Sequence, residues 1–126
     1  MMGRLGSLAV GFLLGGYARY FLAARVYQGL GTAFPYGTLA VNLSGCLAIG
    51  FLDALAESRS LLGPEARLLL MTGFCGAYTT FSTLILETSN LLGDGQMLRA
   101  LLNYFGSGLG GLLLFRLGAL LGRMGG

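Results

Sequence analysis

The sequence predicts an all-α membrane protein with four transmembrane helices. Hydrophobic residues make up 55% of the 126 residues and charged residues only 10%, whereas a soluble domain usually carries about 25% charged residues. The apolar residues form four runs, each close to the length of about 20 residues that a helix needs to cross a bilayer. The 23 glycines also suit a membrane protein, because glycine lets transmembrane helices approach closely. We therefore expect a single domain, residues 1–126, that lies in the lipid bilayer.

Short polar segments separate the four runs. Arg25 to Pro35 follows the first run, and Glu57 to Ser60 follows the second. Gly63-Pro64-Glu65 is a turn in which the proline can begin the third helix, and Gly93-Asp94-Gly95 ends that helix. The predicted spans are residues 5–24, 36–56, 68–92 and 98–121. Because so little of the chain lies outside them, the function is expected to reside within the membrane.

Small residues indicate the helix faces that meet. In the first span they recur at every fourth position, at Gly3, Ser7, Gly11 and Gly15. The second and fourth spans carry similar sets, at Ala40, Ser44, Ala48, Gly106, Gly110, Gly118 and Gly122. Such stripes are typical of close helix packing, either within one four-helix bundle or between subunits.

The middle of the third span combines glycines with a run of hydroxyl side chains, from Thr72 to Thr83. Gly73 and Gly76 weaken a helix, and a broken helix is tolerated in a membrane where protein or water satisfies the freed backbone groups. Those carbonyl and N–H groups can then bind a cation or an anion. The alternative is a continuous helix whose hydroxyls bond to the preceding turn.

Several uncommon side chains in the spans are candidates for an ion path, since polar residues there usually face a cavity or a partner. The amide of Asn42, in the middle of the second span, can donate to an anion or bond to a neighbouring backbone. Phe81 lies between hydroxyl residues, where its ring can present a positive edge to an anion or simply pack. Asn103 and Ser107 lie one turn apart in the fourth span and form a polar stripe.

The charged residues argue against an enzyme and against nucleic-acid binding. The chain has no His and no Lys, and its acids lie towards the ends of spans, so few groups remain for proton transfer. The formal net charge is +3, but the arginines are scattered rather than clustered as nucleic-acid binding requires.

The arginines also bear on orientation in the membrane. The side of the two termini would carry Arg4, Arg59, Arg67 and Arg123, and the other side Arg25 and Arg99. Arginine bias in short loops sets orientation, and here that bias is weak. Insertion in both directions is therefore possible, which would permit an antiparallel homodimer.

The run Gly-Phe-Cys-Gly-Ala-Tyr-Thr-Thr-Phe-Ser-Thr at residues 73–83 resembles the signature of the Fluc (CrcB) fluoride channel family. Three further features resemble the same family: Gly15-Gly16-x-x-Arg19-Tyr20, Gly37-Thr38-Leu39-x-Val41-Asn42-x-x-Gly45, and Glu87 six residues after Phe81. The resemblance covers essentially all four spans. The family often has a second Phe three residues after the first, and this chain has Leu84 there, which lacks a positive ring edge.

This resemblance implies a passive channel that lets fluoride leave the cell and so relieves fluoride toxicity. It implies a multi-pass protein of the plasma or inner membrane, assembled as an antiparallel, dual-topology homodimer with two pores. It further implies a structural Na⁺ at the dimer centre, bound by the backbone carbonyls of Gly76 and Thr79.

The resemblance also implies roles for individual side chains. The fluoride path would be lined by Asn42, Phe81, Ser82, Thr83 and Ser107, with Asn103 on the same polar stripe as Ser107. Arg19 corresponds to a basic residue near a vestibule, and we interpret Glu87 as a residue at the end of the pore. The central stretches of the spans contain no cation, which suits conduction because a fixed charge would bind fluoride too tightly.

Two other functions compete with a fluoride channel. A small multidrug exporter would also be a four-helix, dual-topology dimer, but it needs a buried carboxylate in its first helix, and residues 5–24 contain no acid. A non-conducting scaffold subunit would have no need for the glycine break, for Asn42 or for the hydroxyls of the fourth span.

Overall fold

The structure is a computed structural model that describes residues 2–125, which form helices and connections without any β-strand. Single helices make up three spans: α1 (Met2–Leu30), α2 (Tyr36–Glu57) and α6 (Met97–Met124). The remaining span comprises α3 (Pro64–Arg67), η1 (Leu68–Cys75), α4 (Gly76–Tyr78) and α5 (Phe81–Gly93). The stretches long and apolar enough to cross a membrane are Gly3–Leu30, Tyr36–Glu57, Pro64–Gly93 and Met97–Met124. The predicted all-α, four-span architecture is confirmed.

The helices reach beyond the apolar runs that predicted them. α1 continues through Arg25 and Tyr27 to Leu30, and the chain turns where Gly31 takes a φ of 83°. The Gly31 N–H donates to the Tyr27 carbonyl at 2.8 Å, as in a glycine helix cap. The helix thus includes the first polar residues that follow the apolar run, because Arg, Tyr and Gln are all compatible with helix.

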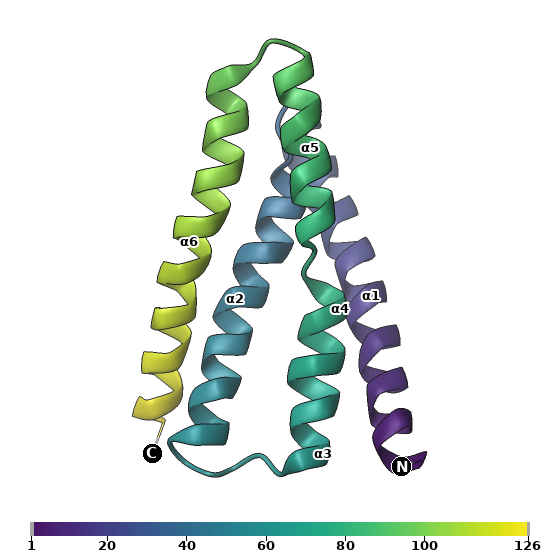
Figure 1. Ribbon diagram of the computed structural model, residues 1–126, viewed down its shortest axis with the longest axis vertical. Helices are drawn as coiled ribbons and strands as arrows, with labels where there is room; N and C mark the ends of the chain where they lie inside the picture. Colours follow the sequence, from purple (N-terminus) through teal and green to yellow (C-terminus); the bar gives the residue numbers. More distant parts are fainter. Residues whose placement is uncertain (1, 126) are drawn as a thin grey trace.

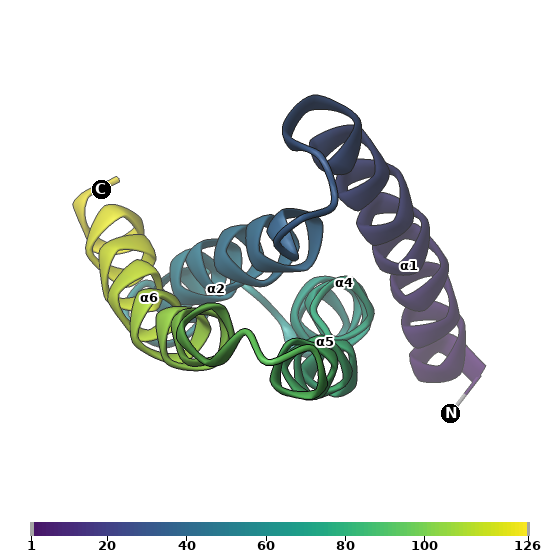
Figure 2. The ribbon, with the colours of Figure 1, turned by 90° about the horizontal axis from the view of Figure 1, so that it is seen from above.

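The four spans form two closely packed pairs (Figure 1). α2 lies against α6, and α1 lies against η1 and α4. Seen from above, α1 and α6 occupy opposite sides of the molecule, with α4 and α5 between them (Figure 2). Both ends of the chain lie at the end of the molecule that carries the α2–α3 connection, and the α5–α6 connection lies at the opposite end (Figure 1).

Glycines bring the backbones of each pair into contact. A Cβ atom at Gly11 would lie 2.8 Å from the Cα of Gly73, and one at Gly15 would overlap the carbonyl oxygen of Phe74. In the other pair, a Cβ at Gly118 would lie 2.9 Å from the Phe51 nitrogen. The small-residue stripes of the first and fourth spans therefore serve, at these positions, to pack helices within one protomer.

The third span is interrupted at two threonines. Thr79 has φ −90° and ψ 158°, and Thr80 has φ −150° and ψ 115°, which are extended rather than helical values. Gly76 keeps a helical φ of −62°. The predicted break is thus seen in part, as a bent, jointed helix, and it lies after the glycines. Threonine suits extended backbone, whereas Gly73 is needed for the contact with α1.

The connection after α2 contains a strained serine, and replacing it should stabilise the protein. Ser60 has a φ of 52°, in the left-handed region that costs a non-glycine residue about 1–2 kcal/mol. We expect Ser60→Gly to raise the free energy of unfolding by about 1 kcal/mol, measured by thermal unfolding in detergent. Ser58 has a helical φ of −80°, so Ser58→Gly is the matched control and should lower stability. A lower melting temperature for Ser60→Gly would contradict this expectation.

Candidate ion-conduction site

Thr79 and Thr80 form the joint of the third span. Thr79 ends one helix and Thr80 starts the next. The Thr79 N–H and hydroxyl both donate to the Cys75 carbonyl, at 3.1 and 2.9 Å. The Thr80 hydroxyl accepts from the Thr83 N–H at 3.3 Å and donates to the Thr83 hydroxyl at 3.1 Å. Thr80 is therefore the N-cap of α5, and threonine is among the residues preferred in that role.

Asn42 on α2 clamps the backbone of the joint. Its Nδ2 donates to the Thr80 carbonyl at 3.1 Å, and its Oδ1 accepts from the Thr80 N–H at 2.8 Å. Since the Thr80 N–H can only donate, this pair fixes which way the amide points. One N–H of the Asn42 amide has no bond within the described residues and remains able to donate. The sequence left open whether this amide binds an anion or a backbone, and the structure shows the backbone bonds.

Two carbonyls at the joint lose the donors that a continuous helix would supply. The Gly76 carbonyl would accept from the Thr80 N–H, which donates to Asn42 instead. The Thr79 carbonyl would accept from the Thr83 N–H, which donates to the Thr80 hydroxyl instead. Carbonyls of unwound transmembrane helices are known to coordinate Na⁺. Among residues 2–125 no group of three or more His, Cys, Asp or Glu side chains could hold a metal.

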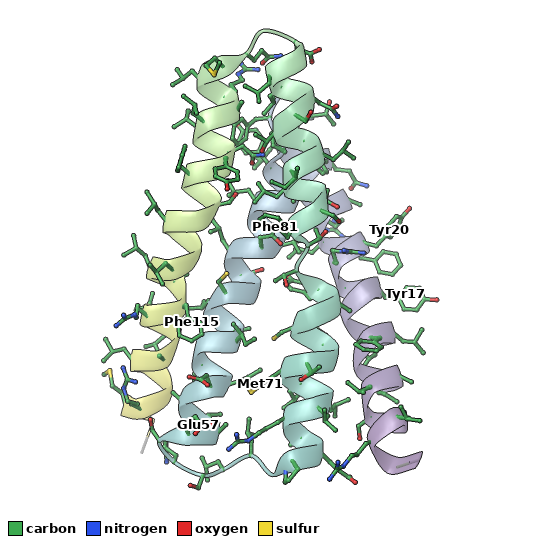
Figure 3. All side chains as sticks on the ribbon, viewed as in Figure 1. Tyr17, Tyr20, Glu57, Met71, Phe81 and Phe115 are labelled. Carbon is green, nitrogen blue, oxygen red and sulfur yellow. The ribbon has the colours of Figure 1, made fainter. Side chains whose placement is uncertain are left out.

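A groove of about 900 Å³ runs beside the joint, between α2, η1, α5 and α6. Among the residues singled out from the sequence, it is lined by Asn42, Gly76, Thr79, Phe81, Leu84 and Ser107. None of its lining residues in the described chain is charged. Figure 3 shows Met71, Phe81 and Phe115, which come from three elements of its wall. Phe81 is 69% exposed in the single chain, so its ring is open to an ion or to another subunit.

Asn103 lies inside the protomer rather than on the groove. It is 0% exposed, and its Nδ2 donates to the Thr88 hydroxyl at 3.0 Å. That hydroxyl gives its own proton to the Leu84 carbonyl at 2.7 Å, so it cannot also donate to Asn103. The Asn103 Oδ1 is consequently buried without a partner in the described residues. The next residue, Tyr104, lines the groove.

The other predicted residues lie outside the groove. Ser82 is exposed, Thr83 is half-buried beside the Thr80 cap, and Arg19 is half-buried on α1. Glu87 lines a second, polar recess of about 660 Å³, together with Asn90, Asp94, Gln96 and Arg99. The structure therefore brings together the joint, Asn42, Phe81 and Ser107, and leaves Arg19 and Glu87 apart from them.

A second contact between α2 and α5 lies one turn above the clamp. The hydroxyls of Thr38 and Tyr27 both donate to the Oε2 atom of Glu87, each at 3.0 Å. The Ser44 and Tyr78 hydroxyls form a further bond of 2.8 Å between α2 and α4. Sequence reasoning missed Tyr27 and Tyr78 as functional candidates. No signal in the sequence could pair Tyr27 with Glu87, because 60 residues separate them.

A jointed transmembrane helix beside an uncharged, partly polar groove defines a class of protein, the membrane channels and transporters. The comparisons with known proteins agree. A family model described as CrcB-like protein, Camphor Resistance (CrcB), matches residues 7–119. The chain is a multi-pass membrane protein and belongs to the CrcB family, as its motifs predicted.

Relatives named "Fluoride-specific ion channel FluC" match nearly the whole chain. The protein of Chlorobaculum tepidum is 50% identical over 117 residues, which are 93% of this chain and 92% of the relative. That of Trichormus variabilis is 46% identical over 119 residues, covering 94% and 87%. That of Solidesulfovibrio magneticus is 45% identical over 125 residues, covering 98% and 99%.

Proposed function

We propose that this protein is a fluoride-selective passive channel of the inner membrane that exports fluoride and relieves its toxicity. Family membership and the names of the relatives support this function. Those names describe ion channels, which fits a protein that is not an enzyme. The structural observation that carries the proposal is the uncharged groove in which Asn42 and Phe81 meet the joint.

The chemistry of the groove suits a small, strongly hydrated anion. Fluoride can leave its water shell only where close donors replace it, and conduction requires that this binding stay weak. The free N–H of Asn42, the ring edge of Phe81 and nearby hydroxyls offer such neutral donors. We assign the path to Asn42, Phe81 and Ser107, which line the groove, and to Ser82, Thr83 and Asn103, which lie outside it in the single chain. Arg19 is assigned to a vestibule and Glu87 to the pore end.

The working unit in this proposal is an antiparallel, dual-topology homodimer with two pores. Phe81, 69% exposed, would face the partner across the groove. Tyr17 and Tyr20 lie midway along α1, are 61% and 69% exposed, and point away from the other helices (Figure 3). Tyrosine hydroxyls normally sit at the membrane surface rather than in its middle. A second subunit over this face would remove that mismatch, and the weak arginine bias permits both orientations.

A structural Na⁺ at the dimer centre forms the last part of the proposal. The Gly76 and Thr79 carbonyls, freed from helical bonding by Asn42 and Thr80, would hold it. When bound, the ion would neutralise the dipoles of carbonyls whose helical donors bond elsewhere. This chain's part is to take those donors away, which the Thr80 cap and the bonds of Asn42 to Thr80 accomplish.

Anion efflux from liposomes tests the function. Purified protein in liposomes loaded with fluoride or chloride should release fluoride far faster than chloride, as measured with ion-selective electrodes. The selectivity is expected because neutral, closely spaced donors favour the smaller anion. Equal release of both anions, or no release of fluoride, would contradict the proposal.

The same efflux assay tests the role of the Phe81 ring. Phe81→Ile removes the positive ring edge while keeping an apolar side chain of similar bulk, and it should cut fluoride release without changing the elution volume of the assembled protein. Phe12 lies on α1, is 48% exposed and does not line the groove, so Phe12→Ile is the matched control and should leave fluoride release unchanged. Unchanged fluoride release in Phe81→Ile would remove that ring from the path.

A further inference from the structure

Three elements converge on the Glu87 carboxylate. Tyr27, in the last turn of α1, and Thr38, near the start of α2, each donate to its Oε2 atom at 3.0 Å. Both donors bond the same oxygen, whereas Oε1 is buried without a partner among the described residues. Thr38 belongs to α2 and the carboxylate to α5. Tyr27 belongs to α1, so it ties the carboxylate to a third helix.

This contact extends the set of polar bonds between α2 and the third span that begins with the bonds of Asn42 to Thr80. Thr38 lies one turn before Asn42 on α2 and shares its face, as residues four apart do. On α5, Glu87 lies one turn after Leu84, and Leu84 lines the groove. Leu84 and Leu91 on either side of Glu87 are 7% and 8% exposed. The carboxylate therefore lies on the inner face of α5, one turn beyond the groove.

Close packing holds the Tyr27 ring in place. Gly37 lies beneath it, and a Cβ atom at Gly37 would approach the ring Cδ2 to 2.6 Å and the Ala23 carbonyl oxygen to 2.8 Å. Thr38 is 7% exposed, so packing holds both donors. Tyr27 is the donor that draws Oε2 toward α1.

We propose that Tyr27 is a positioning residue for fluoride passage, which acts by holding the Glu87 carboxylate toward α1. This inference rests on the proposed function. A carboxylate released from Tyr27 can swing toward the groove one turn away, where its negative charge repels an anion. Held by two donors, the same charge stays to one side of the path.

A double-mutant cycle tests this role in the liposome assay. Tyr27→Phe removes only the hydroxyl and should lower fluoride release by about tenfold, the effect of losing one hydrogen bond to a charged group. In a Glu87→Gln background there is no charge to hold, so the same change should alter release by less than about twofold. Tyr36→Phe, at a 38% exposed position at the start of α2, is the control and should leave release unchanged.

An infrared measurement keeps the proposal testable if Glu87→Gln alone is inactive. The carboxylate band that Glu87→Gln removes should shift in Tyr27→Phe and stay in place in Tyr36→Phe. A band that does not shift, or an equal loss of release in both backgrounds, would overturn the role of Tyr27. A wild-type protein that releases no fluoride would instead refute the proposed function, and the infrared result would still report on the bond between Tyr27 and Glu87.

Discussion

Fluoride release should fall by about a hundredfold when Asn42 is replaced by aspartate, a loss that corresponds to about 3 kcal/mol. The aspartate keeps the shape of the side chain and can still accept from the Thr80 N–H. It loses the Nδ2 group that now donates to the Thr80 carbonyl at 3.1 Å, and it sets an oxygen against that carbonyl. It also removes the spare N–H and adds a negative charge beside the groove.

Liposome efflux together with thermal unfolding measures both parts of this effect. The joint loses one of its two fixed bonds, so the melting temperature should fall along with the fluoride flux. Gln28 is an exposed amide on α1 without a side-chain hydrogen bond in the described residues, so Gln28→Glu makes the same chemical change away from the joint. A fluoride flux near the wild-type rate in Asn42→Asp would show that the clamp is not needed.

The second large effect should come from adding one methyl group to α1. In Gly15→Ala the new Cβ would overlap the carbonyl oxygen of Phe74, and backbone cannot move aside as a flexible side chain can. Overpacking of this kind costs about 1–3 kcal/mol, so the free energy of unfolding should fall by about that amount. The separation of α1 from η1 should also disturb the joint, which begins five residues after Phe74, at Thr79.

The neighbouring glycine supplies the control, with an effect of opposite sign. A Cβ at Gly16 would meet nothing within 4 Å, and alanine favours helix over glycine by about 0.5–1 kcal/mol. Gly16→Ala should therefore melt at a higher temperature than the wild type, and Gly15→Ala at a lower one. Equal melting temperatures for the two variants would contradict the backbone contact.

The sequence was sufficient to predict the four spans, because length and apolar composition decide membrane crossing. It also predicted an interruption in the third span, but placed the weakness at Gly73 and Gly76. The structure puts the joint at Thr79 and Thr80. A glycine is conformationally free wherever it occurs, and only the packing against α1 determines that Gly73 stays helical.

The candidate site was harder to predict, because its bonds join residues far apart in the chain. Asn42 is an unusual residue for an apolar span, yet its two bonds to Thr80 cross 38 residues. Helical spacing places Asn103 and Ser107 on one stripe, and both are buried, but only Ser107 lines the groove. Helical spacing gives the face on which a residue lies, and it does not give the neighbouring helix that the face meets.

The glycine contacts define two closely packed pairs of elements. Backbone touches backbone between α1 and η1, and again between α2 and α6. The third span is joined to α2 by polar bonds instead: those of Asn42 to Thr80, of Thr38 to Glu87 and of Ser44 to Tyr78. Any motion of α2 relative to the third span would therefore strain polar bonds before it disturbed a glycine contact. Asn42 makes two of these bonds, at the place where the ion path is proposed to run.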